Sequence, residues 1–476
     1  MADRIHRAVV KGEPAPGSPR GLLHSRVILL VAFAFAVMAD PVSSVAYAIE
    51  AALRALNGDL ALLFPTMALV VAIIAVVIVN YHQLVARFPE GGGAAAAAGL
   101  AFGEAWAFVP IGALIVDFVL TISISVAAGG SAVVAYFPSL AGARVPMALA
   151  LLVFVGGLTW FGHLGRTVFA AMTLGFIGIG AAVLASGLSK AAAGPVPSVD
   201  PGHSPGIAIL LAFPVAMALA TGVEAPSSAI AQLGQLDDRG RRRFGRITLW
   251  LTLGIVGGLT LGLTTLCVRL HVGIPPQDST QVAEIARRSA GGGLFAAFQL
   301  TSALLLLAAA SSSFQAGPGL LKALARNEGE DSTSIGILPG WTGRTNRHHT
   351  PYWGVVLYLG ASAAVVLAAG ARDQELVLFY AVAVFMSFLA GLVAIARFSQ
   401  RDRRWGSLAL NAVGALVVGF TLIVNLGRGY PIVSFTASLL VAGGLYALWA
   451  RAGRPRGISE AEAMGEEIVG EELGEL

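Results

Sequence analysis

The sequence is poor in charge and almost without cysteine. Charged residues make up 12% of the 476 residues and hydrophobic residues 56%, whereas ordinary soluble proteins carry roughly 25% charged residues. The single cysteine, Cys267, lies in an apolar run, which excludes an intrachain disulfide framework and a cysteine-rich metal site. A composition this apolar predicts an all-α integral membrane protein and leaves no room for a large soluble domain.

Apolar runs of membrane-spanning length recur along the chain. A helix needs about 20 apolar residues to cross a bilayer, and the sequence predicts twelve such helices joined by short loops. The predicted spans cover residues 26–56, 60–82, 104–137, 146–161, 166–189, 206–234, 247–271, 293–325, 352–370, 374–397, 406–426 and 432–450.

The basic residues gather in alternate loops between these spans. All but eight of the 31 Arg and Lys residues fall on one side of the membrane, and cytoplasmic loops carry such an excess. We therefore expect a multi-pass protein of the cell membrane with both termini in the cytoplasm. Residues 1–25 are expected to form a disordered tail, not a signal peptide, and residues 451–476 a short, acidic, solvated tail.

Two of the apolar spans are interrupted by nearly the same polar phrase. Asp40-Pro41-Val42-Ser43-Ser44 stands in the first span, and Glu224-Ala225-Pro226-Ser227-Ser228 in the sixth. A carboxylate is costly in hydrocarbon and a proline removes a helical hydrogen bond, so neither phrase suits a passive membrane helix. We expect both helices to be broken there, at Pro41, Ser43, Ser44, Gly222 and Pro226.

The positions of the two phrases suggest an internal repeat. Spans 1–5 (residues 26–190) begin on one side of the membrane and spans 6–10 (residues 206–397) on the other, and the phrase falls in the first span of each group. This predicts an inverted five-plus-five repeat with spans 11 and 12 (residues 406–450) appended. A chance match between short polar phrases is the alternative explanation.

Three acidic residues, Asp40, Asp117 and Glu224, lie deepest in the predicted spans, and no Lys or Arg lies deep enough to neutralise them. Such carboxylates face a bundle interior or a wet cavity and mark an ion or proton path. Because three buried like charges cannot comfortably stay ionised together, at least one is expected to be protonated when no cation is bound. All three are therefore candidates for proton coupling.

Hydroxyl groups accompany these acids. Asp117, Thr121 and Ser125 are spaced i, i+4, i+8, which places one carboxylate and two hydroxyls on a single helix face. This spacing favours a ladder of oxygen ligands for a cation, although hydrogen bonds to the preceding turn would also explain the hydroxyls. Thr221 precedes Glu224 by three residues, and Tyr47 follows Asp40 by seven.

The phrase Asp40-x-x-Ser43-Ser44-x-x-Tyr47 resembles the first span of potassium–proton symporters of the KUP/HAK/KT family, including its shorter KimA-type bacterial branch, in the amino acid-polyamine-organocation (APC) superfamily. The resemblance continues through Pro89-Glu90-Gly91-Gly92-Gly93. Further matching stretches are Val116-Asp117-Phe118-Val119-Leu120-Thr121, Leu219-Ala220-Thr221-Gly222-Val223-Glu224-Ala225 and Phe379-Tyr380-Ala381-Val382.

The resemblance implies a LeuT-like fold and proton-coupled potassium uptake by alternating access. KimA-type proteins also carry a cytoplasmic domain that binds a cyclic dinucleotide. Only residues 451–476 follow the last span here, which leaves that regulation and that dimer interface open. We expect Tyr47 and Tyr380 to close the cavity as an aromatic gate. By matched position, the implied cation ligands are Asp40, Tyr47, Asp117, Thr121, Ser125, Thr221, Glu224 and Tyr380.

Other functions stay open at this point. An amino acid or polyamine permease of the same superfamily is the alternative, although an acid in the first break would repel a substrate carboxylate but not a polyamine. A divalent-metal importer would need a soft Met or His ligand in the second break, and a sensor would need a signalling tail. We expect no enzyme, no cofactor and no nucleic acid; the expected partners are potassium, protons and the lipid bilayer, with a homodimer left open.

Overall fold

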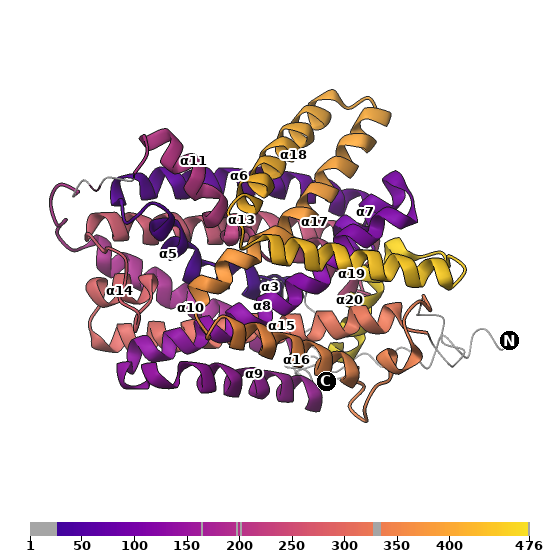
Figure 1. Cartoon of the computed structure of the whole chain (residues 1–476), viewed down its shortest axis with the longest axis horizontal. Helices are drawn as coiled ribbons and strands as arrows, with labels where there is room; N and C mark the ends of the chain where they lie inside the picture. The colour runs from indigo at the N-terminus through magenta and orange to yellow at the C-terminus, as the bar shows by residue number, and fades with distance from the viewer. Residues whose placement is uncertain (1–25, 163–164, 197–198, 200–201, 327–334, 475–476) are drawn as a thin grey trace.

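The structure is a computed structural model, and it describes residues 26–162, 165–196, 199, 202–326 and 335–474. The predicted tail at residues 1–25 lies outside the described residues. Long helices run side by side along the longest dimension of the molecule (Figure 1). This is the arrangement that a bilayer requires, because a helix satisfies every backbone hydrogen bond within its own segment.

The first half of the chain contributes the helices of the predicted spans 1–5. Asp59 caps one of them by accepting a hydrogen bond from the Ala61 N–H at 2.8 Å. The elements are α3 (Arg26–Val37), α4 (Ala39–Ser43), α5 (Val45–Ala55), α6 (Leu60–Arg87), α7 (Gly93–Phe102), η1 (Glu104–Ala107), α8 (Phe108–Tyr136), η2 (Pro138–Ala143), α9 (Arg144–Phe161) and α10 (Arg166–Leu188).

The second half contributes the helices of the predicted spans 6–12. Asp237 and Thr280 cap two of them through side-chain oxygens. The elements are α11 (Pro205–Ala216), η3 (Met217–Ala220), α12 (Ala225–Ala229), η4 (Ile230–Gln232), α13 (Asp238–Arg269), α14 (Gln281–Ser289), α15 (Gly292–Leu324), η5 (Gly340–Gly343), α16 (Tyr352–Ala368), α17 (Asp373–Arg401), α18 (Trp405–Leu426), α19 (Ile432–Arg451), η6 (Ile458–Glu460) and α20 (Ala461–Gly474).

Within the described residues, ten helices are long and apolar enough to cross a membrane. They coincide with ten of the predicted spans, and the remaining two predictions fall on the interrupted α3–α5 and on the 17-residue α16. The predicted all-helical membrane fold is confirmed. The total of twelve spans and the inverted repeat stay predictions.

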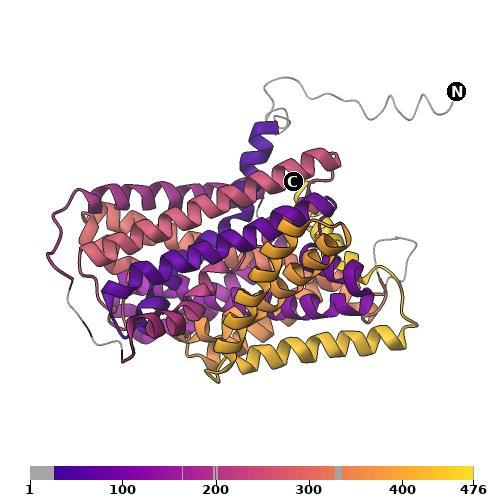
Figure 2. The same cartoon turned by 90° about the horizontal axis from the view of Figure 1, so that it is seen from above.

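Three helices between and after the spans were not predicted: α7, α14 and α20. The molecule carries α14 at one end and α7 and α20 at the other (Figure 1), and the view from above shows the same separation along the long axis (Figure 2). The two ends of the helix bundle are thus each covered by a short helix that does not cross the bundle.

The prediction of a solvated tail at residues 451–476 is wrong for most of its described part. Ile458 and Ala461 are fully buried, and Ile468 and Val469 are nearly so. The apolar side chains of this acidic segment form one buried face. Ile458 and Ala461 pack with Phe108, Leu320 and Leu324 of α8 and α15, and burying this apolar surface holds the segment against the bundle.

Candidate functional site

The sixth span is broken at the predicted place. Helical structure stops at η3, residues 221–224 form a turn, and α12 begins at Ala225. Thr221 is extended (φ −64°, ψ 141°) and Gly222 has φ +76°. A Cβ added to Gly222 would lie 2.7 Å from the Asp40 carboxylate carbon, so only glycine lets the two spans approach this closely.

The first span is interrupted more mildly. It divides into α3, α4 and α5 at Met38 and Ser44, but both residues keep right-handed helical angles. Ser43 donates from its hydroxyl to the Asp40 carbonyl at 2.7 Å, which satisfies a carbonyl near the proline. The first span is therefore kinked near Asp40 and not unwound as predicted, since Pro41 and Ser43 lie inside α4. In the sixth span, the predicted break residue Pro226 likewise lies inside α12.

The two interruptions border one small cavity, which we call the acidic cavity. It has a volume of about 100 Å³, and its lining includes Asp40, Asp117, Gly222 and Glu224. Asp117 and Glu224 are only 4% and 8% exposed. In each of the three acids, one buried carboxyl oxygen has no hydrogen-bond partner: Asp40 Oδ1, Asp117 Oδ1 and Glu224 Oε2. Burial of such oxygens is costly unless a proton or cation occupies the site.

A chain of hydroxyl groups joins the two spans beside this cavity. The Thr221 hydroxyl donates to the Ala218 carbonyl at 2.7 Å, so it must accept from Ser44, whose hydroxyl lies 2.8 Å away. Ser44 has then used its only proton and accepts in turn from the Tyr47 hydroxyl at 2.9 Å. We call these three side chains, Ser44, Tyr47 and Thr221, the hydroxyl layer.

A second cavity, of about 700 Å³, lies on the other side of the hydroxyl layer along the first span. Its lining includes Glu50, Arg54, Arg144 and Asp373, and Arg54 pairs with Glu50 at 2.8 Å. Asp40 and Glu50 are ten residues apart, roughly 15 Å along a helix, and Tyr47 lies between them. The first span thus lines the acidic cavity at Asp40 and the second cavity at Glu50.

The remaining predicted ligands lie elsewhere. Thr121 and Ser125 are buried one and two turns further along α8 than Asp117, and neither lines the acidic cavity. The Ser125 hydroxyl has no hydrogen-bond partner. Tyr380 falls within α17, but its side chain is outside the part that the structure describes. The aromatic gate of Tyr47 and Tyr380 stays a prediction.

Sequence reasoning missed several side chains of the acidic cavity. Gln315 of α15 is 5% exposed and its Nε2 has no partner; the polar run from Ser311 to Gln315 in an otherwise apolar span was the available signal. Glu462 and Glu466 of α20 also line the cavity. No sequence signal places them there, because nothing in an acidic tail distinguishes a docked helix from a solvated one.

One basic residue does lie beside the acids, contrary to the prediction. Arg166, the first residue of α10, lines the acidic cavity and donates to the Gln232 carbonyl at 3.0 Å. The described lining thus holds five carboxyl groups and one guanidinium. Among the residues that the structure describes, no group of three or more His, Cys, Asp or Glu side chains is arranged to hold a metal ion.

Comparison with known proteins assigns the chain to a family. A family model described as amino acid permease matches residues 28–445. The chain belongs to this family. The potassium transporter KimA of Bacillus subtilis (strain 168) is 28% identical in an alignment of 399 residues that covers 79% of this chain and 63% of KimA. The predicted resemblance to KimA-type proteins is confirmed, although the chain spans less than two thirds of that relative.

A solved structure supports the fold. The manganese transporter of Eremococcus coleocola, in complex with an aromatic bis-isothiourea substituted compound, superposes with a TM-score of 0.51 at 14% identity, over 90% of this chain and 95% of that chain. At this identity the likeness shows the fold alone. The chain is therefore a multi-pass membrane protein with the fold of a permease-family transporter.

Proposed function

We propose that the protein takes up potassium by secondary active transport, coupled to protons. The observation that carries this proposal is the acidic cavity itself, in which Asp40, Asp117 and Glu224 each present a buried oxygen without a partner. A small cation and a proton each compensate such oxygens, and in symport the site would carry both at once, potassium at some of the carboxylates and a proton on another. The similarity to KimA supports potassium as the cation.

The size of the cavity favours an ion over an organic substrate. Sites for small organic molecules measure roughly 300–1,000 Å³, whereas the acidic cavity measures about 100 Å³. A free amino acid would also place its carboxylate among acids. A polyamine is not repelled in this way, and the cavity volume is the argument against it.

The two cavities on either side of the hydroxyl layer support alternating access. In this proposal, the acidic cavity faces the cytoplasm and the larger cavity faces outside, which agrees with the excess of basic residues in the loops at the α20 end. The hydroxyl layer would be the barrier that opens when the broken spans move relative to α8 and α15.

A growth assay tests the proposal. The protein is expressed in a bacterium that lacks its own potassium uptake systems, and growth is measured at micromolar potassium beside an empty vector. We expect restored growth. We also expect rubidium uptake that is inhibited by excess potassium but not by putrescine or amino acids. Absence of growth with a well-inserted protein, or competition by putrescine alone, would refute potassium transport.

A further inference from the structure

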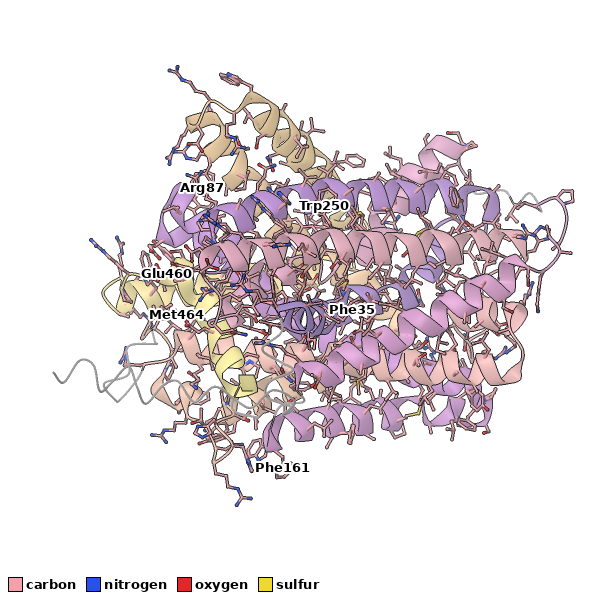
Figure 3. All side chains as sticks on the ribbon, turned by 180° about the vertical axis from the view of Figure 1, so that it is seen from behind. Phe35, Arg87, Phe161, Trp250, Glu460 and Met464 are labelled. Carbon is pink, nitrogen blue, oxygen red and sulfur yellow. The ribbon has the colours of Figure 1, made fainter. Side chains whose placement is uncertain are left out.

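Helix α20 lies over the acidic cavity. Glu462, Glu466 and Val469 belong to the cavity lining, although they come from a segment more than 230 residues after Glu224 in sequence. Figure 3 labels Glu460 and Met464 on this segment, at the same end of the molecule as Arg87. The helix therefore closes the end of the cavity that would otherwise open toward the α7 side of the bundle.

Two acids of α20 contact the broken sixth span directly. The Ser228 hydroxyl donates to the Glu462 carboxylate, and Gln232 Nε2 donates to Glu466 Oε2 at 2.6 Å. Ser228 and Gln232 stand immediately after the break, in α12 and η4. The docked helix thus holds the half of the sixth span that follows Glu224.

Glu104 anchors the segment that leads into α20. Its carboxylate accepts hydrogen bonds from the Ser459 N–H at 3.0 Å, the Ser459 hydroxyl at 3.3 Å and the Gly457 N–H at 3.4 Å. A carboxylate that accepts hydrogen bonds from both backbone and side-chain donors of one segment fixes the position of that segment. The anchor lies on η1, outside the cavity, so it can be changed without altering the cavity lining.

Gly465 sets the distance between α20 and α15. A Cβ added there would lie 2.9 Å from the Leu320 N and 3.2 Å from the Gly319 carbonyl carbon, closer than backbone atoms tolerate. A large side chain at this position must displace the helix. Gly465 therefore offers a way to undock α20 while every charged group is kept.

We propose that α20 is a gate over the acidic cavity. In this proposal, Glu462 supplies a further carboxylate to the path of a small cation between the cavity and the water beyond it. The identity of the cation rests on the proposed function. Undocking would free Ser228 and Gln232 and open the cavity. Docking would keep the cation in contact with Glu462 at the cavity mouth. Nothing in the amino acid sequence of α20 alone indicates this role.

The gate is tested by the rate at which a thiol reagent labels an introduced cysteine in the purified protein. This measurement requires neither transport nor a known orientation of the protein in a membrane. The reporter is Ser313→Cys in a Cys267→Ala background, because Ser313 lines the cavity and is 2% exposed. Adding Gly465→Leu should raise the labelling rate by about tenfold or more, since the rate follows the undocked fraction. Glu104→Ala, which removes only the anchor, is the second variant and should raise it in the same direction.

Two controls accompany the labelling. Glu467→Gln changes the exposed neighbour of Glu466 on the same helix and should leave the rate unaltered. A reporter at the exposed position 404, Arg404→Cys, should label equally in every background, which controls for differences in reagent and thiol reactivity, and thermal unfolding in detergent shows whether the variants stay folded. Equal Ser313→Cys labelling in the docked and the Gly465→Leu proteins would overturn the gate.

The role of Glu462 is tested by rubidium uptake. Glu462→Gln should raise the half-saturating concentration about tenfold, the factor expected when one charged partner worth about 1.5 kcal/mol is lost, and Glu467→Gln should not. Equal half-saturation in both variants would overturn this role. Faster labelling in a protein that carries no potassium would leave the gate in place and refute the proposed function instead.

Discussion

The hydroxyl of Ser44 lies 2.8 Å from the hydroxyl of Thr221, although the two residues are 177 positions apart. They belong to the two interrupted spans, and the direction of the Thr221 bond to Ala218 fixes Ser44 as the donor. This hydrogen bond joins the two interrupted spans on the side of the acidic cavity opposite α20. In the proposed transport cycle, opening of the larger cavity toward the acidic cavity would break this contact.

Replacing Thr221 by Val removes the acceptor of Ser44 and leaves a buried hydroxyl unsatisfied. We expect a loss of about 1–3 kcal/mol in the free energy of unfolding. The measurement is thermal unfolding in detergent, with Thr221→Ser as the matched control that keeps the oxygen. Equal stability of the Val and Ser variants would contradict a stabilising hydrogen bond between Ser44 and Thr221.

Asp117→Asn keeps the size of the side chain and removes its charge. We expect rubidium uptake to fall about 100-fold, because loss of one partner of a buried charge costs about 3 kcal/mol or more. Insertion and thermal stability should be unaffected, since Asp117 Oδ1 has no partner to lose. Ordinary uptake by a well-inserted Asp117→Asn protein would remove Asp117 from the cation path.

Substitutions of the two hydroxyl residues of α8, Thr121 and Ser125, should have different effects on stability. Ser125→Ala removes an oxygen that has no protein partner, so stability should be kept while the half-saturating cation concentration rises a few-fold, about 1 kcal/mol. Thr121 does have a partner, and Thr121→Val should lower both stability and affinity. If neither change moves half-saturation in uptake assays, the predicted oxygen ladder is wrong.

Coupling to protons is tested in proteoliposomes. If one of Asp40, Asp117 and Glu224 keeps its proton while potassium binds at the others, the two ions move inward together, so inward potassium movement should acidify the lumen and should slow when external pH is raised. The assay records internal pH with the membrane potential held fixed. Potassium uptake that continues undiminished after the proton gradient is collapsed would indicate a uniporter.

The sequence predicted the spans and the meeting of Asp40, Asp117 and Glu224, because hydropathy and intramembrane acids are strong signals. It could not predict which end of the cavity is closed. That depends on a long-range contact between Ser228 and Glu462, and residues 461–474 read as a solvated acidic stretch when taken alone. Arg166 was missed for a related reason, since its place at the end of a span gives no sign of the cavity beside it.

The docking of α20 should depend on pH. Burial raises the pKa of the Glu462 carboxyl above its usual value, and burial, opposed by the hydrogen bond from Gln232, raises the pKa of Glu466 to about 7. Glu462 raises the pKa of Glu466, and the other charged or titratable groups that act on these two carboxyls are Glu224, Tyr81 and Arg166.

The sign of the effect follows from proton linkage. Because the docked helix holds protons more tightly than the undocked one, docking is strongest below the ordinary carboxyl pKa of 4.5 and weakens as pH rises toward 7. Labelling of Ser313→Cys, divided by that of Arg404→Cys to cancel the thiol's own ionisation, should therefore be faster at about pH 8 than at about pH 5.5. Glu462→Gln combined with Glu466→Gln should flatten this ratio, whereas Glu467→Gln should leave it as in the parent. A ratio that does not change with pH in the parent protein would show that these carboxyls do not control the docked state.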